Sequence, residues 1–243
     1  MIKKIAKYVG FTLILGYLSI AGMIYHVGKQ PAVYRDVSVV ICDSAELSFL
    51  KASDIYNIMK QNKISPYGKR IEEFDTQQLT RCIAQNKLIR DVRCYHTPDS
   101  ILRIDIFQRH PIMRVKNNVG KDYYIDTEGN IMPVQTGIAI YLPIATGNIS
   151  NEMAQNELYE FAKFLNHDSF WRSAITQINV KADGDVELIP RVGSHIILLG
   201  SFDNFQNKLD NLYTFYQKVL NVKGWNLYKT INIKFQGQVI GEK

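Results

Sequence analysis

Cysteine and histidine are scarce in this chain of 243 residues, which contains 3 cysteines and 5 histidines. Neither a Cys-x-x-Cys pair nor a His-Glu-x-x-His spacing is present, so the sequence indicates no redox motif, no metal site and no cofactor. Three scattered thiols are also too few for a disulfide scaffold. A disulfide between Cys42 and Cys94, on neighbouring strands, is kept as an alternative to free and buried thiols.

The loops typical of nucleotide binding and of catalysis are missing as well. The chain has no Gly-x-x-x-x-Gly-Lys-Ser/Thr loop, no Gly-x-Gly-x-x-Gly turn and no Gly-x-Ser-x-Gly elbow. Asp122 and Asp126 could pair as the carboxylates of a glycosidase-like cleft. Their position around a hairpin favours a role in turns instead. The sequence therefore predicts a protein that is not an enzyme.

The net charge of +6 could suggest nucleic-acid binding, but the distribution of the charges along the chain argues against it. Residues 1–35 hold five of the 29 Lys and Arg residues and none of the 23 Asp and Glu residues. The remaining chain, with 24 basic and 23 acidic residues, is nearly neutral. Because a nucleic-acid binder gathers its basic residues on one face or stripe, no nucleic-acid partner is predicted.

The charge-free stretch from Tyr8 to Gly28 is long enough for a helix that crosses a membrane, which needs about 20 apolar residues. We therefore expect a transmembrane signal anchor at residues 8–28, after a cytoplasmic tip at residues 1–7. The lysines of the tip favour an N-terminus in the cytoplasm, with the following domains in the periplasm. A cleaved signal peptide is the alternative; it fits less well because the apolar run continues past Ala21 without an Ala-x-Ala site.

After a linker at residues 29–35, the pattern predicts a compact β-α-α-β-β domain at residues 36–110. Ser53 is expected to cap the first helix, and Asp75 with Gln78 the second, which buries Leu79, Cys82 and Ile83. Alternating apolar residues predict the last two strands. The expected elements are strands at 36–41, 89–96 and 100–109 and two helices that cover one face of the sheet.

Residues 111–243 predict a second, β-rich domain with a mainly antiparallel sheet and two helices, so that the fold class is α+β. The expected helices cover residues 152–166 and 204–222. In the final expected strand, at 229–236, apolar residues alternate with polar ones, as in a half-buried edge strand that can pair with a partner's strand. The alternative is that this strand only buries one face, while Lys229 and Lys234 block its edge.

Six short motifs follow one another along the chain: Leu102-Arg-Ile104 with Pro98, Arg109-His-Pro111, Tyr123-Tyr-Ile-Asp126 with Gly129, Leu142-Pro143 with Gly147, Leu199-Gly200 before Lys208-Leu209, and Ile231-Asn-Ile-Lys-Phe235. Their order and spacing resemble those of the FtsQ (DivIB) family of bacterial division proteins, including its POTRA domain. One departure is Gln108, where the family's junction motif usually has Glu; if that carboxylate forms an ion pair across the junction in relatives, a neutral hydrogen bond must replace it here.

The resemblance implies a scaffold without catalysis, in the cytoplasmic membrane at the division site. It implies binding to FtsB-like and FtsL-like proteins, control of septal cell-wall synthesis, and recruitment of other division proteins through the POTRA-like domain. The alternatives are a membrane-anchored envelope enzyme or glycan-binding domain with a POTRA-like module, and a POTRA-bearing translocation factor. The implied partner-binding residues are Tyr228, Thr230, Ile231, Asn232, Ile233, Lys234 and Phe235.

Overall fold

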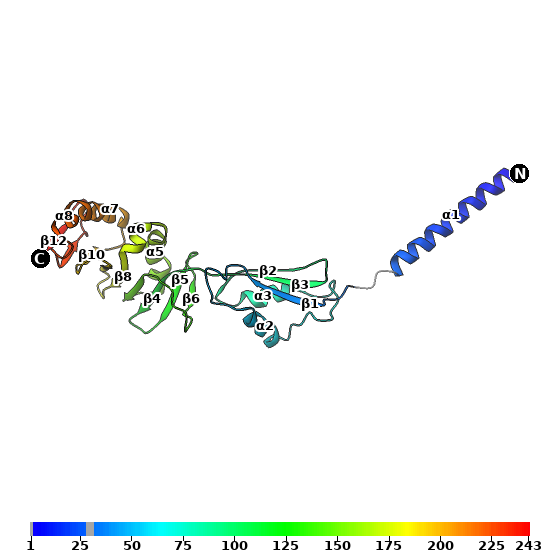
Figure 1. Ribbon diagram of the computed structural model, residues 1–243, viewed down its shortest axis with the longest axis horizontal. Helices are drawn as coiled ribbons and strands as arrows, with labels where there is room; N and C mark the ends of the chain where they lie inside the picture. Colours follow the sequence, from blue (N-terminus) through cyan, green and yellow to red (C-terminus); the bar gives the residue numbers. More distant parts are fainter. Residues whose placement is uncertain (1, 28–31) are drawn as a thin grey trace.

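The computed structural model describes residues 2–27 and 32–243, and it describes the side chains of the first stretch only for residues 10–23. Helix α1 (Ile2–Val27) is followed along the molecule by a domain built on a three-stranded sheet and then by a domain built on a nine-stranded sheet (Figure 1). The α+β organisation with a POTRA-like first domain is therefore observed.

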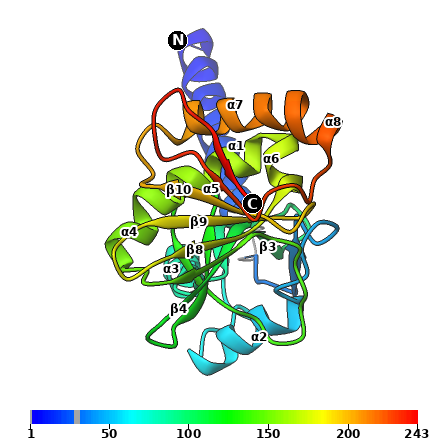
Figure 2. The same cartoon turned by 90° about the vertical axis from the view of Figure 1, so that its left-hand side faces the viewer.

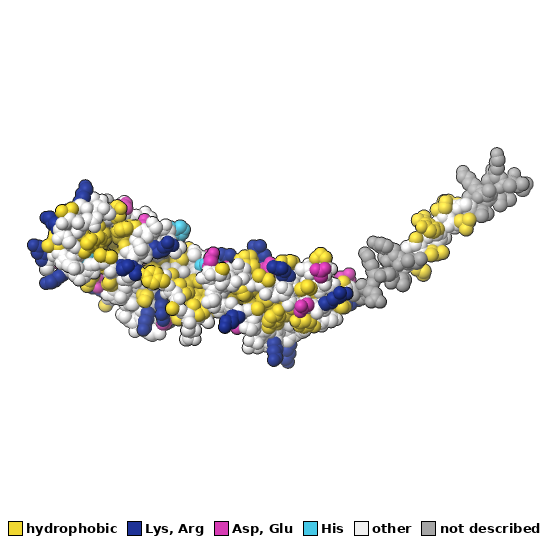
Figure 3. All heavy atoms as spheres, in the orientation of Figure 1, with side chains coloured by type: hydrophobic (Ala, Val, Ile, Leu, Met, Phe, Trp, Pro, Cys, Tyr) yellow, Lys and Arg dark blue, Asp and Glu magenta, His cyan; other side chains and the backbone are white. Residues whose placement is uncertain are grey.

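The transmembrane helix expected at residues 8–28 is the part of this fold prediction that is wrong. Within the described residues, no helix is both long and apolar enough to cross a membrane. Three glycines and the polar Ser19, whose hydroxyl donates to the Leu15 carbonyl (2.8 Å), lower the mean hydropathy of the helix, although exposed apolar side chains cover much of it (Figure 3). The absence of charge alone does not make a span. The side chains of the lysine-rich tip, and residues 28–31 of the expected span and linker, lie outside the described residues.

The first domain has the predicted β-α-α-β-β order, with β3 in the centre of its sheet. Strand β1 runs parallel to β3, and β2 runs antiparallel to it. Ile55 and Leu79 from the helices and Ile104 from the sheet are fully buried, so both helices cover one face. The elements are β1 (Asp36–Ile41), α2 (Ala52–Gln61), α3 (Thr76–Ala84), β2 (Ile89–His96) and β3 (Ile101–Gln108).

Of the two helix caps predicted for this domain, one is observed and the other is not. Asp75 caps α3 by accepting from the Gln78 backbone N–H (2.8 Å), as expected. Helix α2 begins after Lys51 instead of Ser53, because the Asp54 carboxylate accepts from the Lys51 N–H (2.8 Å) and so stabilises the first turn from inside the helix. Cys82 is partly exposed rather than buried.

All three cysteines are free thiols. A disulfide between Cys42 and Cys94 is contradicted, because β3 lies between β1, which Cys42 follows, and β2, which contains Cys94. The two residues are therefore on strands that are not neighbours, which places them too far apart for the geometry of a disulfide.

The second domain contains one sheet with the strand order β12-β11-β10-β9-β8-β7-β4-β5-β6. Helices α5, α6 and α7 lie on one face of β8, β9 and β10 (Figure 2). Strands β10 and β11 are parallel, and the chain between them crosses over through α7, a π-helical turn and α8. The strands are β4 (Pro111–Asn117), β5 (Asp122–Asp126), β6 (Ile131–Pro133), β7 (Ile144–Gly147), β8 (Ile175–Val180), β9 (Val186–Pro190), β10 (Ile196–Gly200), β11 (Thr230–Asn232) and β12 (Ile240–Glu242).

Both helices expected in this domain are more broken than the sequence suggests. The first is interrupted at Asn156, which has a non-helical backbone (φ −115, ψ −95), and the second changes to π-helix at Tyr216–Leu220. The apolar stripe continues through both interruptions, so the pattern alone does not reveal them. The helices are α4 (Asn151–Gln155), α5 (Glu157–His167), α6 (Ser169–Ala174), α7 (Phe205–Phe215) and α8 (Asn221–Lys223).

A buried polar network lies at the end of the first domain, next to the domain boundary. The side-chain amide of Gln108, which is fully buried, donates to the Asp43 carboxylate (2.9 Å) and to the Leu47 carbonyl (2.9 Å), and its oxygen accepts from the Leu50 N–H (2.9 Å). The neutral hydrogen bonds expected of this residue are thus present. They stay within the first domain instead of crossing the junction.

The ion pair that does cross the junction belongs to the next residue. Arg109 contacts the buried Asp126 (2.7 Å) and the more exposed Glu128 (3.2 Å) of the second domain. Apolar packing continues across the same boundary, since Tyr124 and Met132 of the second sheet are buried in the core of the first domain. The junction therefore holds the β5–β6 end of the large sheet firmly against the first domain.

Candidate functional site: the C-terminal edge of the large sheet

The predicted partner-binding strand is shorter than expected and is not the outermost strand. Strand β11 covers Thr230–Asn232 and pairs with β10 on one side and with β12 on the other. Gly237, at φ +72, allows the chain to turn back after β11, and the Gln238 N–H donates to the Phe235 carbonyl (3.3 Å) in this turn. The edge of the sheet is therefore β12, which the sequence reasoning missed.

The apolar residues of the predicted site divide between core and surface. Ile231 and Ile233 are buried in the core of the domain, as their alternation suggests. Phe235 is 57% exposed and so does not anchor the strand on the core. Ile240 of β12 is 42% exposed. Strand β12 is thus accompanied by two exposed apolar side chains, Phe235 and Ile240.

The Tyr228 ring packs against the backbone of β12 at Gly241. A Cβ atom placed on Gly241 would lie 2.6 Å from the Tyr228 ring, so the strand can rest on this ring only because residue 241 has no side chain. The ring also packs against Phe215 of α7, with 5.8 Å between the centroids. Because residue 241 is a glycine, the Tyr228 ring can contact both the edge strand and helix α7.

The polar residues of the predicted site tie these last strands together. The Thr230 hydroxyl donates to the Glu242 carboxylate (2.9 Å), and the Asn232 side-chain oxygen accepts from the Lys234 N–H (3.0 Å). Lys234 itself forms an ion pair with Asp185 in the turn between β8 and β9. The structure thus brings the predicted site residues together at one corner of the domain.

Two buried polar side chains hold the loops next to this corner. The ammonium of Lys208 donates to the carbonyls of Leu199 (3.1 Å) and Ser201 (2.9 Å), and burial lowers its pKa. His195 lies against the Tyr216 hydroxyl (3.0 Å), and burial lowers the pKa of its imidazole, which favours the neutral ring. These contacts hold the two ends of β10 against α7 and the π-helical turn that follows it.

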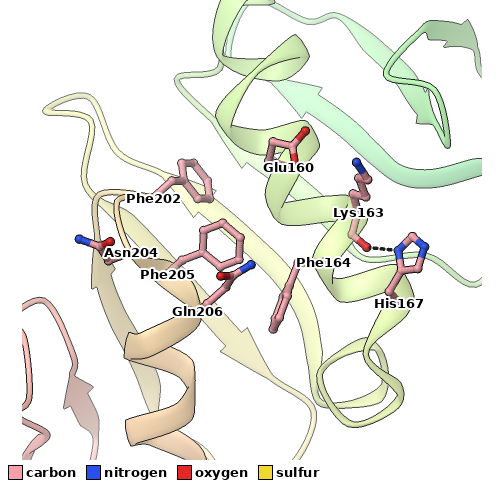
Figure 4. A pocket seen from close by; sticks show the side chains of 8 residues that line it. All are labelled: Glu160, Lys163, Phe164, His167, Phe202, Asn204, Phe205 and Gln206. Carbon is pink, nitrogen blue, oxygen red and sulfur yellow. Dashed lines mark hydrogen bonds between the residues drawn. The ribbon is translucent and has the colours of Figure 1, made fainter.

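Away from this corner, a hollow with a volume of about 470 Å³ lies between α5 and the start of α7 (Figure 4). Phe164, Phe202 and Phe205 line it, with Glu160 and His167 at its rim. The His167 Nδ1 faces the Lys163 backbone carbonyl (2.7 Å), one helical turn earlier. Among the residues that line this hollow there is no nucleophile beside a base, so its arrangement does not resemble a catalytic site.

The carboxylates considered for a glycosidase-like cleft do not face each other across a cleft. Asp122 pairs with Arg114 (2.6 Å), and this hydrogen bond lowers the pKa of the Asp122 carboxyl. Asp126 is buried against Arg109. Within residues 32–243 and the described part of α1, no group of three or more His, Cys, Asp or Glu side chains could hold a metal ion.

Comparison with known proteins agrees with this architecture. The family model described as FtsQ/DivIB, C-terminal related, matches residues 110–242, which is more than half of the chain. The chain belongs to the FtsQ/DivIB family. A model of the POTRA-like domain matches residues 32–107. No curated protein matches the chain.

Membership in the FtsQ/DivIB family indicates a role in cell division and interaction with other division proteins. Members of this family are non-catalytic proteins of the division site. The two matched segments are separated by Gln108 and Arg109, and Arg109 forms the ion pair that crosses the domain boundary.

Proposed function

We propose that this FtsQ/DivIB family protein is a non-catalytic scaffold of the bacterial divisome, which binds FtsB-like and FtsL-like proteins and so links early division proteins to septal cell-wall synthesis. In this proposal residues 111–243 bind the partner at the C-terminal edge. Residues 36–110, the POTRA-like unit, recruit other division proteins.

The observation that carries the proposal is the open outer edge of β12. This strand pairs only with β11 among the described strands, so its other side offers backbone N–H and C=O groups to an incoming strand. A partner strand that adds there would extend the nine-stranded sheet by main-chain hydrogen bonds, and side-chain contacts would provide specificity.

The predicted site residues support this edge in different ways. Ile231 and Ile233 hold β11 on the core, Tyr228 supports β12, and Phe235 offers an exposed ring to the partner. Lys and Arg side chains gather at the end of the domain where the C-terminus lies, which favours an approaching segment of opposite charge (Figure 3).

The test is copurification of the tagged full chain with coexpressed FtsB-like and FtsL-like proteins of the same bacterium. We expect Phe235→Lys to lower their recovery by about tenfold or more, because an aromatic anchor is replaced by a charge. Tyr67→Lys is the matched control, since Tyr67 is similarly exposed (54%) but lies in the first domain. Equal recovery with Phe235→Lys and with the unchanged chain would refute the proposed edge.

A further inference from the structure

A groove with an apolar and basic lining lies at the start of β8 and the end of β9. The C-terminal corner described above lies at the opposite end of these two strands, beside the turn that joins them. The groove has a volume of about 720 Å³ and lies where β7 and β8 begin, beside the ends of α5 and α6. Apolar side chains dominate its lining, and no Asp or Glu is among the lining residues. The lining includes Tyr141, Leu142, Ile144, Ile175, Arg172 and Arg191.

Two arginines give the groove a positive charge that no carboxylate balances. Within residues 32–243, neither Arg172 nor Arg191 forms an ion pair; the Arg191 Nε donates to the Ser173 backbone carbonyl (2.7 Å), and its guanidinium lies over the exposed Tyr141 ring, 4.7 Å from the centroid. The pair of guanidiniums therefore remains available to a carboxylate from outside.

The wall of the groove before β7 is built like an unpaired strand. Ile138, Ile140 and Leu142 alternate along it and pack against the core of the first domain, whereas Tyr141 is 73% exposed. This period of two is typical of an extended segment. Residues 138–142 form no backbone hydrogen bond with any described residue. An anchored extended segment with free backbone groups can pair with an added strand.

We propose that this groove binds an extended acidic segment of a partner protein, in which carboxylates alternate with apolar side chains. The carboxylates pair with Arg172 and Arg191, the apolar side chains contact Tyr141 and Ile144, and the backbone pairs with residues 138–142. This site lies at β7 and β8, whereas the C-terminal edge lies at β11 and β12, so the two sites can be occupied independently.

The test is fluorescence anisotropy of the full chain with a labelled synthetic peptide that alternates Glu with Val and Leu. We expect the double variant Arg172→Glu/Arg191→Glu to raise the dissociation constant by about tenfold or more, because charge pairs become repulsive. Arg81→Glu, a single charge reversal at a side chain that is 72% exposed on α3 of the first domain, is the control and should leave the affinity unchanged. Phe235→Lys should bind the peptide normally. Poly-Glu of equal charge should bind more weakly, since it lacks the apolar side chains.

Hydrogen exchange provides the second measurement. Added peptide should slow exchange of the backbone amides of residues 138–142, and this protection should disappear in the double arginine variant. Absence of peptide binding, unchanged affinity of the double variant, or protection only at β11 and β12 would each overturn the proposal. A chain that dimerises in light scattering, and loses the dimer in the double variant, would show that a second copy occupies the groove instead.

Discussion

The two ends of the nine-stranded sheet differ in how their edges are covered. At the β5–β6 end, Tyr124 and Met132 are buried in the first domain, and Arg109 pairs with the buried Asp126. At the β11–β12 end, the outermost strand has three residues and lies beside the exposed Phe235. One end of the same sheet is covered within the chain, while the outer side of β12 pairs with no other described strand. Stability should therefore depend on the first end, and partner binding on the second.

The largest effect on stability is expected for Gln108→Leu. This change leaves the Leu47 carbonyl and the Leu50 N–H without their side-chain partner and removes one hydrogen bond from the Asp43 carboxylate, which keeps the bond from the Gln108 backbone N–H (2.8 Å). We expect the free energy of unfolding, measured by urea denaturation, to fall by about 3 kcal/mol. Gln77→Leu, on the exposed side of α3, is the control and should change it by less than about 0.5 kcal/mol. Equal losses for both variants would contradict a special role of the buried Gln108 side chain.

A somewhat smaller effect is expected for Arg109→Met. Removing the guanidinium leaves the buried Asp126 carboxylate without its cation, but the N–H groups of Glu128 (2.9 Å) and Asn130 (2.7 Å) still donate to it. The loss in unfolding free energy should therefore be about 2 kcal/mol, below the cost of a fully unpaired buried charge. Arg90→Met, on the exposed side of β2, is the control. An unchanged denaturation midpoint for Arg109→Met would show that the domains are joined by apolar packing alone.

The loss in unfolding free energy caused by Gln108→Leu should depend on pH. Burial by itself raises the pKa of Asp43, but hydrogen bonds from the Gln108 side chain and backbone outweigh burial, so the pKa is lowered. A lowered pKa contributes stability above the unfolded value of about 4 and loses it as pH falls through the folded value. The difference in unfolding free energy should thus be larger at neutral pH and should narrow in acid. A difference independent of pH would assign the effect to packing.

The smallest effect on stability is expected at the open end. Gly241→Val places a side chain against the Tyr228 ring and should displace β12. Because β12 makes three residue pairs, we expect a loss below about 1 kcal/mol, together with faster hydrogen exchange at Thr230–Asn232. Tyr228→Ala/Gly241→Val, which removes the opposing ring, should restore slower exchange. A large loss from Gly241→Val would mean that this edge is part of the stable core.

Sequence patterns predicted the regular elements well where apolar alternation is strong. Strands β1 and β2 have the expected bounds, and Asp75 caps α3 as expected. Strand β12 was missed because three residues that include Gly241 carry too little alternation to recognise. The transmembrane prediction failed because it counted missing charges and gave too little weight to Gly10, Gly16 and Gly22.

The candidate sites were only partly predictable because they depend on contacts between distant parts of the chain. The resemblance pointed to residues 228–235, but which strand lies outermost follows from pairing in space, which a local pattern does not contain. The groove combines Tyr141, Arg172 and Arg191, and nothing in their separate surroundings in the sequence indicates that they meet. Local sequence patterns thus predict helices and strands better than they predict binding surfaces, which residues distant in the sequence form together.

The parallel pairing of β10 with β11 also determines when the open edge can form during folding. The chain has to cross over through α7 and α8 before β11 can reach β10, so these contacts join residues far apart in the sequence. We expect such contacts to form late, since the entropy of closing the loop must be lost first. Strand β12 can pair only after β11 is in place. An incompletely folded domain therefore has no β12 edge, and an assembly that recognises this edge selects folded molecules.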